Sequence, residues 1–170
     1  MNIRDVANGV VFTKLNFNMD SFEERLIFQK KMYLLQGLGT DLGYSYNWYI
    51  RGPYSPGLSK YAYSNYEMLS EADYSGYTLV GDTEKNINIV NELRNDNDEE
   101  EMSVGKWYEL LASLLYLYHN HGSFMIKESD SNAIADKLVS LKPTFSKDNC
   151  LNGIMTLEKK GFFRGEVIGN

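Results

Sequence analysis

Two histidines form the triplet His119-Asn120-His121, and they are the only histidines in the chain. Imidazole nitrogens bind transition metals and transfer protons, so the first candidate chemistry is that of a metal-dependent nuclease. At positions i and i+2 of a helix the two rings point in different directions, and no carboxylate or third histidine is spaced to complete a site. We therefore interpret the triplet as the C-terminal end of a helix, where the helix dipole favours histidine.

Cys150 is the single cysteine and a second candidate, because a thiolate can act as a nucleophile. Such a cysteine needs an adjacent base, and the sequence places no histidine beside it. Its position within an expected helix indicates a small buried hydrophobic residue instead. One cysteine cannot form an internal disulfide, so we expect a reducing, cytoplasmic location.

Two further patterns imitate catalytic motifs. The glycines between residues 37 and 43 resemble a phosphate-binding loop, but such a loop follows a strand and opens a helix, and the order here is reversed. Five acidic residues between 96 and 101 lie in one continuous run, whereas paired catalytic carboxylates face each other across a cleft. We therefore expect a protein that is not an enzyme and that has no catalytic residue, cofactor or metal.

Tyrosine is concentrated in one segment of the chain. Nine of the 13 tyrosines and Trp48 lie between residues 44 and 77, together with Arg51 and Lys60. Three interpretations stay open: an aromatic core around one strand, a protein-binding surface rich in tyrosine and arginine, or a platform on which bases stack. Among surfaces, we expect a protein-binding one with Arg51, Tyr54 and Lys60 at its edge.

The elements that position these residues are mostly helices. Hydrophobic periodicity and capping residues predict a first helix over 3–15 and a second that Asp20 caps and Gly37 ends. Alternating aromatic residues predict a strand over 44–51, which Gly52-Pro53 breaks before Ser55-Pro56 starts the next helix. Four more helices are expected, beginning after Asp82, Ser103, Asp130 and Ser146. The second helix is apolar over more than half its circumference, so we expect it to be central.

Composition is that of an ordinary globular chain, with 170 residues, 43 % of them hydrophobic and 24 % charged. We predict an α+β fold that is predominantly α, with about seven helices, one short aromatic-rich β element and a winged-helix-like arrangement as a variant. The acidic run suggests a seam between subdomains 1–95 and 96–170 of one compact body. No stretch is long and apolar enough to cross a membrane. The net charge of −6 opposes binding to phosphate.

Residues 25–63 contain a pattern that resembles the core motif of the SocA/Panacea antitoxin-like and YwgA-like bacterial families. The first part is a helix segment with Gln29, Lys30 and Tyr33, and the second is an aromatic strand with Trp48 that leads into Gly52-Pro53. The spacing between the two parts agrees with the family pattern. Phe28 and Lys31 replace the usual leucines, and two extra residues precede Gly52-Pro53.

The resemblance implies a mostly helical protein of a bacterium or phage without known catalysis. Panacea-type domains are antitoxins that neutralise a partner toxin by direct contact, and SocA is an adaptor that delivers its partner to a protease. We therefore expect a non-catalytic protein-interaction module whose partner is a toxin or a defence-related protein, with an undetermined oligomeric state.

A DNA-binding transcription regulator is the alternative. The helical pair that ends in Leu157-Glu158-Lys159-Lys160-Gly161 resembles the close of many winged-helix domains, whose last helix would enter a major groove. Residues 130–161 contain five lysines and no arginine, so contacts to phosphate are conceivable but bidentate readout of guanine is not supported. The lysines are Lys137, Lys142, Lys147, Lys159 and Lys160.

Overall fold

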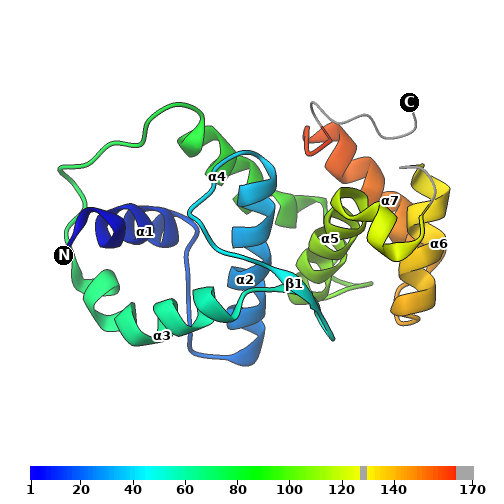
Figure 1. Ribbon diagram of the computed structural model, residues 1–170, viewed down its shortest axis with the longest axis horizontal. Helices are drawn as coiled ribbons and strands as arrows, with labels where there is room; N and C mark the ends of the chain where they lie inside the picture. The colour runs from blue at the N-terminus through cyan, green and yellow to red at the C-terminus, as the bar shows by residue number, and fades with distance from the viewer. Residues whose placement is uncertain (127–129, 164–170) are drawn as a thin grey trace.

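The computed structural model describes residues 1–126 and 130–163. Within them, seven helices and one two-stranded antiparallel sheet confirm the prediction of a predominantly α fold with a short β element. The elements, drawn in Figure 1, are α1 (Ile3–Lys14), α2 (Phe22–Gly37), β1 (Asn47–Tyr49), β2 (Gly52–Tyr54), α3 (Pro56–Glu71), α4 (Thr83–Glu92), α5 (Val104–His119), α6 (Ser131–Leu141) and α7 (Lys147–Lys159). Short 3₁₀ turns follow α4 and α5.

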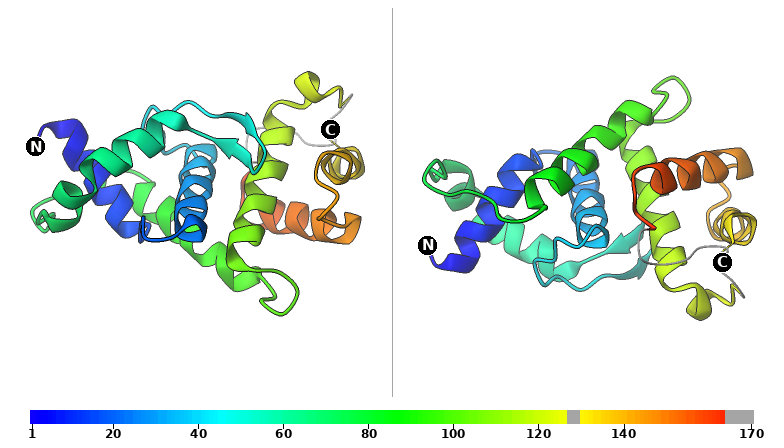
Figure 2. Two further views of the ribbon diagram at one scale, coloured as in Figure 1. Left: turned by 90° about the horizontal axis from the view of Figure 1, so that it is seen from below. Right: turned by 90° about the horizontal axis from the view of Figure 1, so that it is seen from above.

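Helix α2 occupies the middle of the molecule, as its apolar circumference predicted. Residues 28–35 of α2 are all buried. Helices α1, α3 and α4 lie on one side of it, and α5 packs against the other side with α6 and α7 beyond (Figures 1 and 2). One continuous hydrophobic cluster therefore contains residues from α1 near the N-terminus and from α7 near the C-terminus.

Most helix starts lie where the capping residues predicted them. The side chains of Ser55, Ser103, Asp130 and Ser146 each accept a hydrogen bond from a backbone N–H of the helix that follows. The prediction that Asp20 caps α2 was wrong, because the Ser21 hydroxyl accepts the bond from the backbone N–H of Glu24 instead. The Asp82 side chain makes no capping hydrogen bond to α4.

The predicted strand over 44–51 and the break at Gly52-Pro53 were also wrong in their bounds. Strand β1 covers only Asn47–Tyr49, the chain turns at residues 50 and 51, and Gly52 and Pro53 begin β2. Proline lacks the N–H that a central strand needs, but both strands of a two-stranded sheet are edges and tolerate it. The result is a hairpin, with Trp48 opposite Pro53, whose second strand packs on α2 and α5.

Substitution of Gly52 tests this hairpin. Its φ of +88° lies in the left-handed region, and a Cβ added to Gly52 would lie 2.4 Å from Ser113 Oγ. Gly43 has a similar φ of +85° with nothing within 4 Å of such a Cβ. We expect Gly43→Ala to cost about 1–2 kcal/mol of unfolding free energy, from backbone strain alone. Gly52→Ala should cost about 2–3 kcal/mol, because the clash adds to the strain.

Urea unfolding of the two variants and of Gly52→Ala/Ser113→Ala measures this difference. The double variant removes the clashing oxygen, so its cost should fall to that of Gly43→Ala. Equal unfolding free energies for Gly52→Ala and Gly43→Ala would show that the close approach to α5 has no energetic effect.

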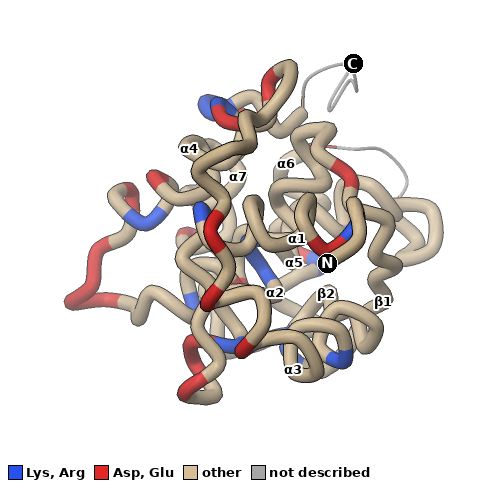
Figure 3. Tube along the Cα trace, turned by 90° about the vertical axis from the view of Figure 1, so that its left-hand side faces the viewer, with Lys and Arg blue, Asp and Glu red and all other residues tan. Residues whose placement is uncertain are grey.

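The acidic run at 96–101 lies in an exposed loop between α4 and α5, which projects from the body with the densest red in Figure 3. Across this predicted seam, α2 packs extensively on α5.

The hairpin lies before α3 and not after the last helix. Residues 160–163, the described part of the chain that follows α7, contain no strand. No helix of the described chain is long and apolar enough to cross a membrane.

Candidate functional site

The tyrosine-rich segment contains one group that packs into or against the core and another that lines a groove. The Tyr44 hydroxyl donates to Asn8 Oδ1 at 2.9 Å, and the Tyr46 ring packs on Tyr33 with ring centroids 5.1 Å apart. Tyr61 donates to an Asp5 carboxylate oxygen at 2.5 Å. For these residues the interpretation as aromatic core is the correct one.

Three other tyrosines, Tyr49, Tyr54 and Tyr63, line an open groove of about 470 Å³. The groove lies between α2, the hairpin and α3, and its lining is mainly apolar. Tyr49 and Tyr63 are exposed, as is Phe22 at the N-terminal end of α2. The other lining residues are Arg25, Leu26, Gln29, Lys30, Ile50, Arg51 and Ser59.

Two arginines of the groove are held by aromatic rings. The Arg51 guanidinium lies 5.3 Å from the centroid of the Phe22 ring, and that of Arg25 lies 6.0 Å from the Tyr63 ring. Arg25 also donates to the Met19 carbonyl at 3.1 Å. A cation–π contact of this kind attracts a guanidinium to the ring, and the guanidinium has further N–H groups that can bind another acceptor.

The residues Gln29 and Lys30 attach α2 to the end of the hairpin. The Gln29 amide accepts from the Ser55 N–H at 3.0 Å and donates to the Ser55 carbonyl at 2.9 Å. Lys30 is 1 % exposed, and its Nζ donates to the Pro53 carbonyl at 2.6 Å. Burial lowers the pKa of Lys30 to about 7; nearby Glu109 opposes this shift, and the cations Lys142 and Arg51 add to it.

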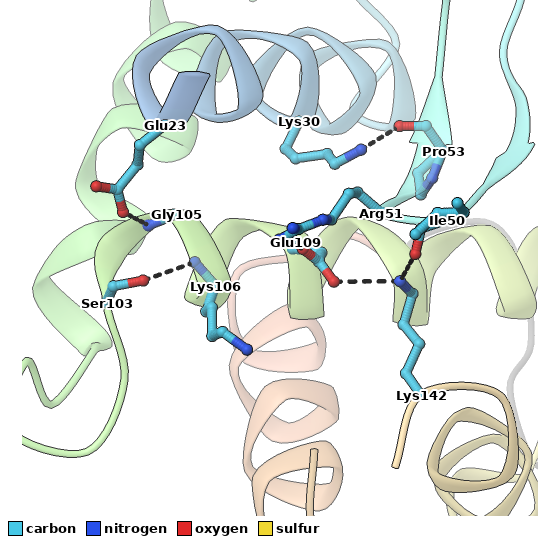
Figure 4. A network of polar contacts seen from close by, with 10 residues as sticks. All are labelled: Glu23, Lys30, Ile50, Arg51, Pro53, Ser103, Gly105, Lys106, Glu109 and Lys142. Carbon is cyan, nitrogen blue, oxygen red and sulfur yellow. Dashed lines mark hydrogen bonds and ion pairs between the residues drawn. The ribbon is translucent and has the colours of Figure 1, made fainter. Parts of the chain in front are cut away.

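A buried ion pair attaches the hairpin to the C-terminal half of the chain. Lys142 Nζ lies 3.1 Å from Glu109 Oε2, with side chains that are 8 % and 7 % exposed, and it also donates to the Ile50 carbonyl (Figure 4). Arg51 Nη1 lies 4.0 Å from the other oxygen, Glu109 Oε1, which has no hydrogen-bond partner among the described residues. Arg51 and Lys142 therefore lie within 4.0 Å of one carboxylate, with which Lys30 also interacts electrostatically.

Of the three residues predicted to bind protein, the structure brings Arg51 and Tyr54 together in the groove. Lys60 is exposed on α3 but does not line it. Two other residues of the resemblance, Tyr33 and Trp48, have packing positions: the rings of both lie against Tyr116.

The residues first considered for catalysis lie apart from the groove. Cys150 is buried, and burial raises the pKa of its thiol to about 11. His119 ends α5 as predicted, and a ring nitrogen of His121 lies 3.1 Å from the Ile126 carbonyl. Residues 1–126 and 130–163 contain no group of three or more histidine, cysteine or acidic side chains that could hold a metal ion.

Three of the five C-terminal lysines that could contact phosphate are paired with carboxylates. Lys142 binds Glu109, Lys147 Nζ lies 3.0 Å from Asp136, and Lys160 Nζ lies 3.9 Å from Asp96. These pairs reduce the positive charge that α6 and α7 present to a nucleic acid.

Sequence reasoning did not connect four residues with this region: Phe22, Arg25, Glu109 and Lys142. Glu109 carried a signal, because it is the only acidic residue in the mainly apolar segment 104–119. A carboxylate in such a segment is buried only when it is paired. No local signal connects the others with the groove: Phe22 and Arg25 belong to α2, and Lys142 directly follows α6.

A larger hollow of about 810 Å³ lies elsewhere, between α1 and the loops at 38–42 and 77–83. Its charged lining residues are Asp41 and Asp82, both acidic, and none of the predicted site residues lines it. The smaller groove is the better candidate because it combines aromatic anchors with convergent cations.

Comparison with protein-family models, with curated proteins and with solved structures found no match to this chain.

Proposed function

We propose that the protein is a non-catalytic interaction module that binds a partner protein directly through the groove beside the β-hairpin. The observation that carries this proposal is the exposed combination of Phe22, Tyr49 and Tyr63 with Arg51, which is 52 % exposed at its side chain. Aromatic residues and arginine are enriched in the energetic centres of protein interfaces, because they bury a large area at low entropic cost.

The antitoxin-like part of the proposal comes from the resemblance of residues 25–63 to Panacea-type domains. In the structure Gln29 and Lys30 hold the backbone of residues 53–55, which positions Tyr54 in the groove. We propose a toxin or a defence-related protein as the partner, which the module neutralises or delivers by contact rather than by chemistry.

The test begins with the native protein purified from the cells that make it, together with the protein that co-purifies. We expect Arg51→Ala and Tyr54→Ala each to weaken the affinity for that partner at least about tenfold, because truncation of an energetically central interface residue costs about 2 kcal/mol or more. Calorimetric titration measures the affinity.

Lys60→Ala and Tyr77→Ala are the matched controls, since both residues are exposed outside the groove. The controls should bind the partner as the unmodified protein does. Unchanged affinity in both groove variants would contradict the location of the surface.

A salt series separates this function from DNA binding. A protein partner held by buried aromatic area should stay bound, whereas duplex binding through many phosphates would weaken by orders of magnitude between about 50 and 200 mM salt. Tight duplex binding that is sensitive to salt and that Lys147→Glu or Lys159→Glu abolishes would favour a transcription regulator instead.

A further inference from the structure

The groove is suited to bind apolar side chains. Its mainly apolar lining includes Tyr49, Tyr54 and Tyr63 together with Phe22 and Leu26. Its volume of about 470 Å³ is within the range of sites that enclose a small ligand or a few side chains. An occupant of this groove must therefore present an aromatic or large aliphatic group.

The charges of the groove have one sign. Arg25, Lys30 and Arg51 line it, and the described residues of its lining include no aspartate or glutamate. Glu109, whose Oε1 lies 4.0 Å from Arg51 Nη1, is bound by Lys142 at 3.1 Å. This positive surplus is local, because the chain as a whole carries a net charge of −6.

The excess of positive charge also destabilises the free protein. Burial is the main cause of the lowered pKa of Lys30; Glu109 opposes the shift, and Lys142 and Arg51 lower the pKa further. A second carboxylate at the groove would offset the repulsion. The two guanidiniums lie near aromatic rings, and a guanidinium carries planar donor pairs that match a carboxylate.

Resting on the proposed function, we infer that the groove binds a segment of the partner protein in which an aspartate or glutamate lies next to an aromatic or large aliphatic side chain. The carboxylate binds between Arg25 and Arg51, and the apolar side chain packs on the tyrosines. A nucleic acid fits less well, because its phosphates need an extended basic track, whereas Lys147 and Lys160 elsewhere on the surface face carboxylates.

A random peptide library displayed on phage and selected on the immobilised full chain tests this inference. We expect enriched sequences with an acidic residue adjacent to a large apolar one. Anisotropy of a fluorescein-labelled synthetic copy of the most enriched peptide then gives its affinity. Arg51→Met or Arg25→Met should weaken that affinity about tenfold or more, whereas Lys60→Met, which removes an equal charge outside the groove, should change it less than about threefold.

A double-mutant cycle identifies the contact itself. Replacing the peptide's glutamate by glutamine, or its aspartate by asparagine, should weaken binding to the unmodified protein, but should have much less effect on Arg51→Met. Because Arg51 lies near Glu109, the cycle is repeated with Arg25→Met, whose side chain makes no ion pair within the described residues. Additive effects in both cycles would overturn the inference.

Three other results would also overturn it. The first is enrichment of peptides without acidic residues. The second is displacement of the peptide by an oligonucleotide of about 20 bases at moderate salt, with loss of oligonucleotide binding in Arg51→Met. The third is loss of the native partner in Tyr54→Ala but not in either arginine variant, which would leave the proposed function intact. A native partner that binds all three variants normally would overturn the proposed function and the acidic segment together.

Discussion

Replacing Glu109 by leucine is expected to lower the unfolding free energy by about 3–5 kcal/mol, the largest single effect that the structure implies. The change leaves Lys142 buried without its carboxylate, near the basic side chains of Lys30 and Arg51. A buried charge of this kind loses hydration on folding, and the hydrogen bond that Lys142 keeps to the Ile50 carbonyl does not replace the lost carboxylate. Urea unfolding followed by circular dichroism measures the loss.

The double variant Glu109→Leu/Lys142→Met separates loss of the pair from loss of packing. Removing both charges should recover most of the stability, because an apolar pair of similar volume replaces a buried ion pair at little cost. Lys147→Met serves as the matched control, since its pair with Asp136 is exposed and should contribute less than about 1 kcal/mol. A double variant as unstable as Glu109→Leu would show that the carboxylate stabilises the fold by another route.

Stability should increase as pH rises from 6 to 9.5, in contrast to the plateau typical of small proteins. Lys30 has a pKa of about 7 in the folded protein against an ordinary value of 10.5. Between these values the unfolded chain binds more protons, so the unfolding free energy rises with pH. Lys30 alone contributes roughly 3 kcal/mol over this interval, and Lys31, whose pKa burial lowers to about 8, adds in the same direction.

Unfolding of Lys30→Met across the same pH range identifies the group responsible. The variant should show a much smaller rise, while Lys31→Met should keep most of it. Above pH 10 the trend should reverse, because burial raises the pKa of Tyr33 and Tyr46 and deprotonation then favours the unfolded chain. A rise that is equally large in Lys30→Met and in the unmodified protein would contradict the assignment.

Local sequence chemistry determined most of the helical elements. Ser55 with Pro56, Ser103, Asp130 and Ser146 each mark a helix start that the structure confirms, because capping satisfies backbone groups within three or four residues. The central position of α2 could also be predicted, since an apolar circumference has to be covered on several sides.

The hairpin shows where this local information ends. Alternating aromatic residues predicted one strand to Arg51, but the chain turns at residues 50 and 51 and pairs back on itself. At the turn Gly52 lies so close to α5 that a Cβ would clash with Ser113, about sixty residues further along the chain. No window of neighbouring residues contains that contact.

For the site, the sequence by itself determined that Arg51 and Tyr54 lie in an aromatic segment suited to an interface, since residue type and position are enough for that. Only the tertiary structure decided that Tyr44, Tyr46 and Tyr61 belong to the core while Tyr49, Tyr54 and Tyr63 line a groove. It also decided that Arg51 and Lys142 lie within 4.0 Å of Glu109 and that Lys30 interacts with it electrostatically. The physical reason is that burial and charge pairing depend on which elements pack together, and residues 30, 51, 109 and 142 come from four separate segments of the chain.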